Sequence, residues 1–318
     1  MPIPCGRIAG VEKPVSRLIL GCGPLREDDM AQAERMLDAF VARGGTALDT
    51  AHVYGRDGAS ERAVGRWLAS RGRRAEIVVI TKGGHPAPDW SPRVSPEVID
   101  AELTESLERL QTPYIDLYLL HRDNPALPVG PLVECLNEQL VRGRIRAFGG
   151  SNSHPRRLAA ANAYAEAHGL RGMAASSPFF ALAIAHDPPR MGHAILNGDR
   201  EARDWYRETG FPLLSWTSQA QGFFSARANR EDPAALRHFQ RYDDPDNWER
   251  RRRTWELASR RGCTPTQVAL AWVLRQPLNA HPIIGSGSVP HLEDAVGALD
   301  VHLTPEELAW VNLEDTPV

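Results

Sequence analysis

Lysine is almost absent from this sequence, since only Lys13 and Lys82 occur among its 37 basic residues. The four cysteines lie far apart and form no CxxC pair or Cys/His cluster, which excludes a disulfide framework and a structural zinc site. No apolar run approaches the roughly 20 residues that a membrane-spanning helix needs. The 37 basic and 40 acidic residues nearly cancel, so no overall field attracts nucleic acid or anionic lipid. These absences leave a globular protein with a small-molecule partner, and no feature fixes an oligomeric state.

The first residues and the even composition bear on location and domain organisation. Residues 1–6 lack the basic segment and following apolar stretch of a signal peptide, which favours a cytoplasmic protein. A chain of 318 residues is long enough for two domains or for one large barrel. Because no linker rich in Pro, Gly or Ser interrupts it, we expect a single domain over residues 1–318.

Short apolar runs alternate with longer segments of helical period, such as 28–43 and 95–110. Eight of these runs are candidate strands, namely 17–20, 46–48, 76–80, 115–120, 145–148, 172–175, 212–215 and 282–284. A strand followed by a helix, eight times over, predicts a (β/α)8 TIM barrel of the α/β class. Two longer stretches, 178–199 and 219–247, follow the sixth and seventh strands and are predicted to be loops over the carboxyl-terminal mouth.

Three helix starts are marked by a capping residue directly before a proline. Ser95, Thr264 and Thr304 are predicted N-caps, each with Pro at the first helical position. Gln267 and Glu307 stand three residues after the last two caps, which predicts capping boxes.

Polar residues of distinct chemistry follow three consecutive predicted strands. Asp49 and Tyr54 follow the second strand, Lys82 the third and His121 the fourth, so a barrel would bring them to one mouth. Reduction of a carbonyl needs a proton donor, and a phenol is a weak acid unless a nearby cation stabilises its phenolate. Lys82 would be that cation, Asp49 its counter-charge, and His121 would orient the substrate oxygen. In a chain that uses Arg almost everywhere, a Lys at a strand end indicates a task that a guanidinium cannot perform.

These tracts resemble the aldo-keto reductase superfamily in sequence and in order. The resemblance rests on residues 48–55, 80–83, 116–121 and 149–152, and it continues to 282–286 and beyond. It implies NAD(P)-dependent interconversion of aldehydes or ketones with alcohols. It also implies that Asp49, Tyr54, Lys82 and His121 are the catalytic residues.

The same resemblance implies a set of cofactor-binding residues. Ser151 and Asn152 would hold the nicotinamide carboxamide, and Trp216 would stack on the ring in place of the usual Tyr. Ser177 stands where the family commonly has a longer amide side chain, and the backbone of 217–222 would cradle the pyrophosphate. The full set is Gly21, Ser151, Asn152, Ser177, Trp216, Thr217, Ser218, Gln219, Gln221, Gly222, Gly285, Ser286, Ser288, His291 and Asp294.

The adenosine end lacks the basic residue that often marks a ribose 2′-phosphate. No Lys or Arg occurs after Arg275. Ser286, Ser288, His291 and the start of a helix near Pro290 would hold the phosphate less tightly than a guanidinium. We therefore expect NADP(H) as cofactor with a modest preference, and NAD(H) as a possible alternative.

The mouth loops determine the substrate. The candidate substrate-binding groups are His85, Trp90, Arg122, Asp123 and the loops that begin at Phe179 and Phe223. Beside Asn152 they would suit a polyol or sugar carbonyl, because aromatic faces cover C–H surfaces and charged groups bind hydroxyls.

Competing interpretations have weaker support. Gly21–Arg26 resembles the opening of a Rossmann fingerprint but lacks its third glycine. The scattered histidines do not form the ligand set of a metal-dependent hydrolase, so no metal is expected. The Arg250–Arg253 run is predicted to be a solvated helix face and not a nucleic-acid patch. A non-catalytic, cofactor-sensing partner subunit on the same fold remains the alternative function.

Overall fold

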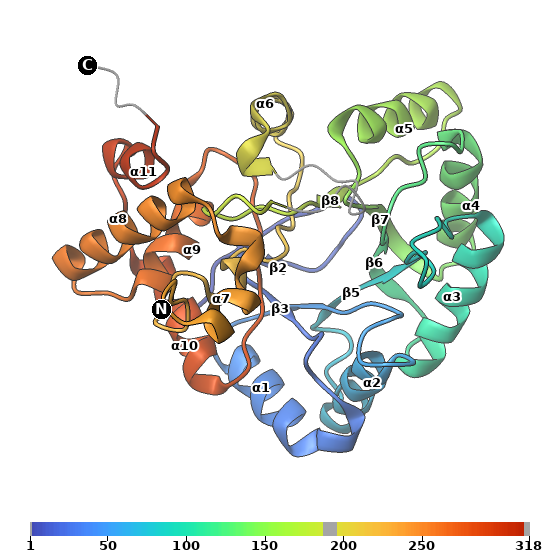
Figure 1. Ribbon diagram of the computed structural model, residues 1–318. Coiled ribbons are helices and arrows are strands. Elements are labelled where there is room, and N and C mark those ends of the chain that lie inside the picture. Colours follow the sequence, from blue (N-terminus) through green and yellow to red (C-terminus); the bar gives the residue numbers. More distant parts are fainter. Residues whose placement is uncertain (1, 187–195, 315–318) are drawn as a thin grey trace.

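The computed structural model describes residues 2–186 and 196–314, and these form a curled parallel sheet surrounded by helices (Figure 1). Seven strands follow the order β8-β7-β6-β5-β4-β3-β9, so consecutive strands from β3 to β8 lie side by side, and β9 pairs with β3. Their bounds are β3 Ile19–Gly21, β4 Ala47–Asp49, β5 Val78–Gly83, β6 Ile115–Leu120, β7 Ile145–Ser151, β8 Ala175–Ser177 and β9 Ile283–Ile284.

The predicted seventh strand, 212–215, closes the sheet through single bridges. Leu213 forms parallel bridges with Ser176 on one side and with Ala280 on the other. The backbone N–H of Leu214 donates to the Ser176 carbonyl at 2.7 Å, and the N–H of Ile283 donates to the Ser215 carbonyl at 2.8 Å. The chain therefore fills the gap between β8 and β9, and the predicted barrel fold is confirmed.

Helices cover the outside of the barrel (Figure 1). The predicted segments 28–43 and 95–110 contain α1 and α3, and the three predicted N-caps and two capping boxes are present. The bounds are α1 Met30–Ala42, α2 Ala59–Arg71, α3 Pro96–Arg109, α4 Val129–Val141, α5 Pro155–Ala167, α6 Arg200–Thr209, α7 Pro233–His238, α8 Pro245–Arg261, α9 Pro265–Arg275, α10 Val289–Gly297 and α11 Pro305–Val311.

The two stretches expected to be loops differ in what the structure describes. Part of the first, residues 187–195, lies outside the described residues, and a short 3-10 turn follows at Leu196–Gly198. The second stretch, 219–247, is not all loop, because it holds α7, two 3-10 turns and the start of α8. Buried aromatic rings such as Phe223, Phe239 and Tyr242 give these short helices an apolar base.

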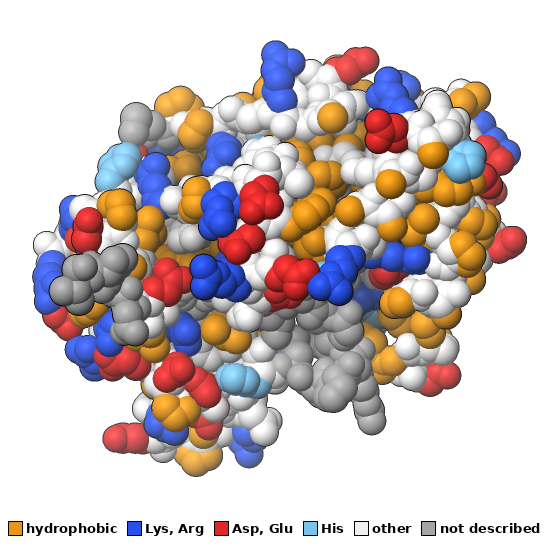
Figure 2. All heavy atoms as spheres, turned by 90° about the horizontal axis from the view of Figure 1, so that it is seen from above, with side chains coloured by type: hydrophobic (Ala, Val, Ile, Leu, Met, Phe, Trp, Pro, Cys, Tyr) orange, Lys and Arg blue, Asp and Glu red, His pale blue; other side chains and the backbone are white. Residues whose placement is uncertain are grey.

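The Arg250–Arg253 run lies within α8, and the prediction of a solvated face was wrong for its first member. Arg250 is buried and donates to Asn247, and Arg251 is half-buried over the Trp255 ring. Arg252 is exposed and pairs with Glu249 and Glu256. On the face shown in Figure 2, acidic and basic side chains are likewise interspersed. Among the described residues, no helix combines the length and apolar character that crossing a membrane requires.

Alternation along the strands decides which side chains enter the barrel. Ala47, Ile80 and Leu119 belong to the cluster that fills the interior, whereas Leu48, Val79 and Leu120 pack outward against the helices. Since successive strand residues point to opposite faces, the residues two positions after the inward ones also face inward. These next positions are Asp49, Lys82 and His121.

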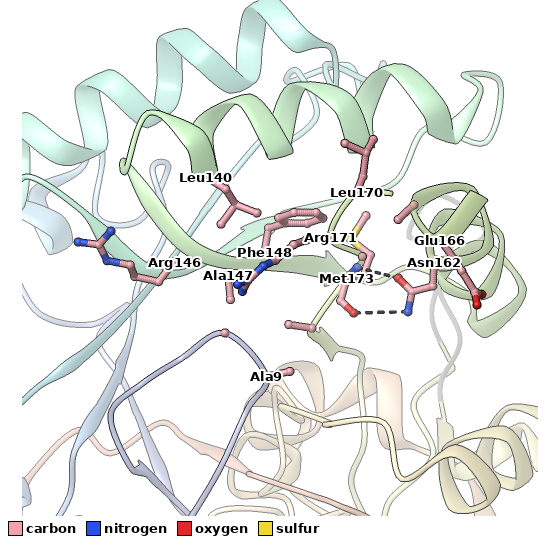
Figure 3. Close-up of a pocket in the computed structure, with 14 residues that line it drawn as sticks. Ala9, Leu140, Arg146, Ala147, Phe148, Asn162, Glu166, Leu170, Arg171 and Met173 are labelled. Atoms are coloured by element: carbon pink, nitrogen blue, oxygen red, sulfur yellow. Dashed lines mark hydrogen bonds between the residues drawn. The ribbon is translucent and has the colours of Figure 1, made fainter. Parts of the chain in front are cut away.

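The amino-terminal end of the barrel is covered by the antiparallel pair β1 (Cys5–Gly6) and β2 (Val15–Ser16). Lys13, in the connecting turn, pairs with the buried Asp116 at 2.8 Å. A cavity of about 450 Å³ lies beside this turn, between Ala9, the first residues of β7 and the segment before β8 (Figure 3). None of the predicted site residues lines it.

The capping box of α9 provides a test of the fold. The Thr264 hydroxyl accepts from the Gln267 N–H at 3.1 Å and donates to Asp294 at 2.7 Å. We expect Thr264→Ala to lower the free energy of unfolding by about 1 kcal/mol, since a first-turn N–H loses its partner. Urea denaturation measures this change, with Thr264→Ser as the control that keeps the hydroxyl. Equal stability of the Ala and Ser variants would contradict the prediction.

Candidate active site

The four predicted catalytic side chains lie together at the carboxyl ends of β4, β5 and β6. The Lys82 ammonium donates to both carboxylate oxygens of Asp49, at 2.6 and 2.7 Å, and to the Thr50 carbonyl at 2.9 Å. The Lys82 Nζ atom lies 5.0 Å from the centre of the Tyr54 ring. The Tyr54 and His121 rings meet edge to face with their centres 5.7 Å apart. The arrangement places a cation between a carboxylate and a phenol.

Burial and pairing oppose each other at the Asp49–Lys82 ion pair. The two side chains are only 4% and 3% exposed. Burial is the largest influence on both groups: it raises the pKa of Asp49 and would lower that of Lys82. The charge of Asp49, together with electrostatic and hydrogen-bonding interactions with Asp49 and Tyr54, outweighs it at the amine, so the pKa of Lys82 is raised above its ordinary value. The ammonium therefore keeps its proton.

His121 is a buried and neutral imidazole. Burial, helped by the nearby Lys82 charge, lowers the pKa of His121 well below its ordinary value. Its Nδ1 atom has no hydrogen-bond partner within the described part of the chain. The backbone of His121 is fixed by two hydrogen bonds. Its backbone N–H donates to the Gly83 carbonyl at 2.7 Å, and its backbone carbonyl accepts from the Asn152 side chain at 3.2 Å. A neutral imidazole keeps one N–H donor, which suits recognition of a polar substrate atom.

Tyr54 is positioned by a left-handed turn that the sequence patterns did not predict. The four residues 55–58 all have positive φ, between 48° and 80°, and Gly58 is the N-cap of α2. The Tyr54 N–H donates to the Ala51 carbonyl at 2.9 Å. A Cβ atom added at Gly23 would lie 3.6 Å from the Tyr54 ring, which is ordinary van der Waals contact, so the backbone of this glycine lies beside the phenol. The two glycines Gly55 and Gly58 were the available signal for the turn.

Ser151, Asn152, Ser177 and Trp216 form a second group, at the ends of β7, β8 and the bridging segment. The Ser151 hydroxyl donates to the Ser177 carbonyl at 3.0 Å, and the Asn152 side-chain amide donates to the Ser151 hydroxyl at 2.8 Å. The Trp216 indole donates to the Asn152 side-chain oxygen at 2.9 Å. The Ser177 hydroxyl is buried, with no partner among the residues described. The hydrogen bonds join Trp216 to the strand ends.

The segment 217–222 has the backbone of an anion cradle. Thr217, Ala220, Gln221 and Gly222 all have positive φ, between 47° and 87°. Such turns aim successive N–H groups at one point. The Ser218 hydroxyl donates to the Ile283 carbonyl at 2.7 Å and ties the segment to β9, while the Gln219 carbonyl accepts from the Gly222 N–H at 3.0 Å.

The last predicted cofactor residues lie around the start of α10. The Ser286 hydroxyl is buried and has no partner in the described structure, and Gly285 has open space beside it. Ser288 is the N-cap of α10 and accepts from the N–H of the exposed His291 at 3.4 Å. Asp294 accepts from both Thr264 and Thr266, and thus anchors α10 to α9.

Two other groups complete this region. Gln32 of α1 donates to the Gly287 carbonyl at 3.1 Å and accepts from the exposed Arg35 at 2.9 Å, so a guanidinium lies near the start of α10. At Gly21, an added Cβ atom would lie 3.1 Å from Ile283, so β3 packs closely on β9 at this glycine.

The predicted substrate residues have different surroundings. Trp90 is 38% exposed and has a φ of +66°. The Arg122 guanidinium lies 5.9 Å from the centre of the Trp216 ring. Asp123 pairs with Arg157 of α5 at 3.0 Å.

Comparison with known proteins agrees with this geometry. Residues 17–312 match the profile of the Aldo/keto reductase family. The chain belongs to the aldo/keto reductase family. It is 30% identical to the uncharacterized oxidoreductase YrpG of Bacillus subtilis, over 94% of this chain and 91% of that protein. It is 29% identical to the aldo-keto reductase str7 of Strobilurus tenacellus, over 91% of this chain and 82% of that protein.

The fold of this aldo-keto reductase is also that of a solved relative. A crystal structure of the thermostable aldo-keto reductase Tm1743, in complex with the inhibitor epalrestat, superposes with a TM-score of 0.73 at 21% identity. The match covers 98% of this chain and 99% of the other. The chain is therefore an enzyme of this oxidoreductase family, and aldo-keto reductases use nicotinamide cofactors.

The residues present fit such a cofactor. Two buried hydroxyls, of Ser177 and Ser286, have no partner among the described residues, and they lie in the two segments expected to contact opposite ends of the molecule. The backbone of 217–222 has positive φ at four residues, and the N–H groups of Ala220 and Gly222 donate within the segment, so a pyrophosphate between the two ends would draw on its other N–H groups.

The buried ion pair gives a double-mutant test. Lys82→Met leaves the buried Asp49 carboxylate without its counter-charge, and we expect it to destabilise the fold by roughly 3–5 kcal/mol. Adding Asp49→Asn should restore most of this loss, because the charge that needed compensation is gone. Thermal and urea unfolding of the single and double variants measure the coupling. Additive losses would show that the two groups do not depend on each other.

Proposed function

We propose that this aldo-keto reductase reduces an aldehyde or ketone to the alcohol, with Tyr54 as the proton donor. The observation that carries the proposal is the Lys82 ammonium, held by three oxygen acceptors at 2.6 to 2.9 Å and lying 5.0 Å from the centre of the Tyr54 ring. A positive charge at this place stabilises the phenolate that remains after proton transfer.

The roles of the four side chains follow from their charges. Tyr54 gives its hydroxyl proton to the carbonyl oxygen as that oxygen gains negative charge. Lys82 stays protonated and stabilises the phenolate, and Asp49 keeps the ammonium in place. His121, as a neutral imidazole, donates a hydrogen bond to the substrate oxygen and orients it beside Tyr54.

When bound, a nicotinamide cofactor supplies the hydride. Ser151, Asn152 and Ser177 would hold its carboxamide, and Trp216, fixed by its bond to Asn152, would stack on the ring. The 217–222 cradle would hold the pyrophosphate. Stacking and hydrogen bonding at these points would orient the cofactor beside Tyr54 and exclude water.

For the ribose end we propose NADP(H), with a modest preference over NAD(H). The hydroxyls of Ser286 and Ser288, together with His291, would bind the 2′-phosphate. The segment that carries these residues contains no arginine. Arg35, a cation on α1, is linked to Gly287 by hydrogen bonds through Gln32.

The proton donor can be tested by removing one oxygen atom. We expect Tyr54→Phe to lower kcat by about 10²-fold or more and to leave cofactor binding near that of the wild type, since only the phenolic proton is lost. Steady-state kinetics with a panel of aldehydes and fluorescence titration with NADPH measure the two quantities. A variant that retains more than about a tenth of the wild-type kcat would rule out Tyr54 as the donor.

Cofactor preference tests the adenosine end. We expect kcat/KM for NADPH to exceed that for NADH by about tenfold, and His291→Arg to increase this ratio, because a charge-assisted bond contributes roughly 1.5–3 kcal/mol. Calorimetry should show tighter binding of 2′,5′-ADP than of 5′-AMP, with the difference enlarged in the variant. A wild-type preference above about a thousandfold, or roughly 4 kcal/mol, would mean that a guanidinium already reaches the phosphate. In that event, loss of the preference in Arg35→Gln would identify it.

A further inference from the structure

The polar groups that suited a polyol substrate are largely engaged within the protein. The Asp123 carboxylate holds Arg157 at 3.0 and 3.1 Å. The Asn152 side chain accepts from Trp216 and donates to the His121 carbonyl and the Ser151 hydroxyl. The Arg122 guanidinium donates to the His121 carbonyl at 3.3 Å, so all three polar side chains expected to bind sugar hydroxyls have partners in the protein itself. These bonds reduce what the three side chains offer a polyol, and other groups beside Tyr54 can contribute to substrate recognition.

A run of rings leads outward from the proposed proton donor. The centres of the Tyr54 and His121 rings are 5.7 Å apart, those of His121 and His85 4.7 Å, and those of His85 and Trp90 6.1 Å. Exposure rises along the run, from the buried His121 through the half-buried His85 to Trp90, which is 38% exposed. Burial lowers the pKa of His85, so its ring is neutral at physiological pH. The run offers apolar ring surface from the reaction centre to the solvent.

The segment that carries His85 and Trp90 is fixed from behind by Glu102 of α3. This buried carboxylate accepts from the Gly84 N–H at 2.7 Å and pairs with Arg93 at 2.8 Å. Arg93 also donates to the His85 carbonyl at 3.3 Å. One carboxylate thereby holds both ends of the segment, immediately after the strand that carries Lys82.

Trp90 is held in a strained conformation at the tip of this segment. Its φ of +66° is unfavourable for a bulky side chain. The turn is locked by the Trp90 N–H donating to the Ala87 carbonyl at 2.8 Å and by the Ala87 N–H donating to the Ser91 carbonyl at 3.1 Å. Asp89 accepts from the Ser91 N–H at 2.9 Å. A strained, exposed aromatic side chain that the surrounding bonds maintain is typical of a binding position.

We propose that His85 and Trp90 form an aromatic wall that selects carbonyl substrates with a flat, apolar body, and that Arg93 and Glu102 are the positioning residues of this wall. The inference rests on the proposed carbonyl reduction and names the substrate class of the same site. Ring stacking on Trp90 and His85 would hold the body of the substrate while its carbonyl reaches Tyr54 and His121. A polyol carbonyl, with its hydroxyls and smaller C–H faces, gains less from such a wall than a flat aromatic body does.

The first experiment compares three aldehydes of different shape. We expect kcat/KM for 2-naphthaldehyde to exceed that for propanal and for D-glyceraldehyde. Trp90→Ala should reduce the naphthaldehyde value about tenfold, through KM, and reduce the propanal value much less. Trp255→Ala is the matched control, because Trp255 has a similar exposure of 39% but lies on α8. A wild-type preference for glyceraldehyde, or an equal loss for all three aldehydes in Trp90→Ala, would overturn the proposal.

The second experiment tests the positioning residues. Arg93→Met should raise KM for 2-naphthaldehyde several-fold while kcat for propanal is kept, and Arg93→Lys should restore part of the loss because it keeps a cation beside Glu102. A purely structural role would instead lower thermal stability and affect both aldehydes alike.

A binding measurement separates this proposal from the proposed function. Calorimetric titration with 2-naphthalenemethanol, the product alcohol, should give a dissociation constant that Trp90→Ala weakens about tenfold and Trp255→Ala does not. A wild-type protein that reduces none of the aldehydes but binds this alcohol through Trp90 would contradict the proposed function and support the wall. If the protein reduces 2-naphthaldehyde and Trp90→Ala does not change the dissociation constant of the alcohol, the result would support the proposed function and contradict the wall.

Discussion

The two-residue alternation of the barrel strands is the constraint on which the candidate site depends. Side chains such as Ala47, Ile80 and Leu119 fill the interior with apolar groups on β4, β5 and β6. The next inward positions on these strands are the polar residues Asp49, Lys82 and His121. A shift of one residue in any of these strands would turn its polar side chain outward against the helices, so packing of the core and assembly of the site are one requirement.

Both lysines of this chain pair with a buried aspartate, one at each end of the barrel. Lys82 converges on Asp49 and the Thr50 carbonyl, and Lys13 on Asp116 and the carbonyls of Arg74 and Ile77. An ammonium can direct its donors at several oxygens around one small point, whereas a planar guanidinium needs a wider, flatter set of acceptors. This difference gives a physical reason for the two exceptions to the use of arginine. It applies equally to a lysine in the proposed chemistry and to one that holds the β1–β2 turn.

Local chemistry and periodicity determine the features that the sequence predicts correctly. Seven of the eight strand positions, the caps at Ser95 and Thr264, and the order of the residues after the strands all follow from patterns a few residues long. The sixth strand, β8, begins only at Ala175, where its predicted run 172–175 ends. Local patterns fail where distant segments decide. Nothing local indicates that Arg250 of an arginine run is buried, since this depends on how α8 lies on the barrel. The apolar base under residues 219–247 comes from rings that only the folded chain brings together.

The same distinction separates the proposed chemistry from the proposed specificity. The side chains around Tyr54 stand on strands and are fixed by the barrel, whereas the wall of His85 and Trp90 stands on a connecting segment that α3 holds through Glu102. Substitutions in that segment can alter the surface offered to a substrate without moving the ion pair at the strand ends. Glu102 is the link between the two, because its bond to Gly84 begins two residues after Lys82. Loss of that bond would release the wall first, since Lys82 keeps three acceptors of its own.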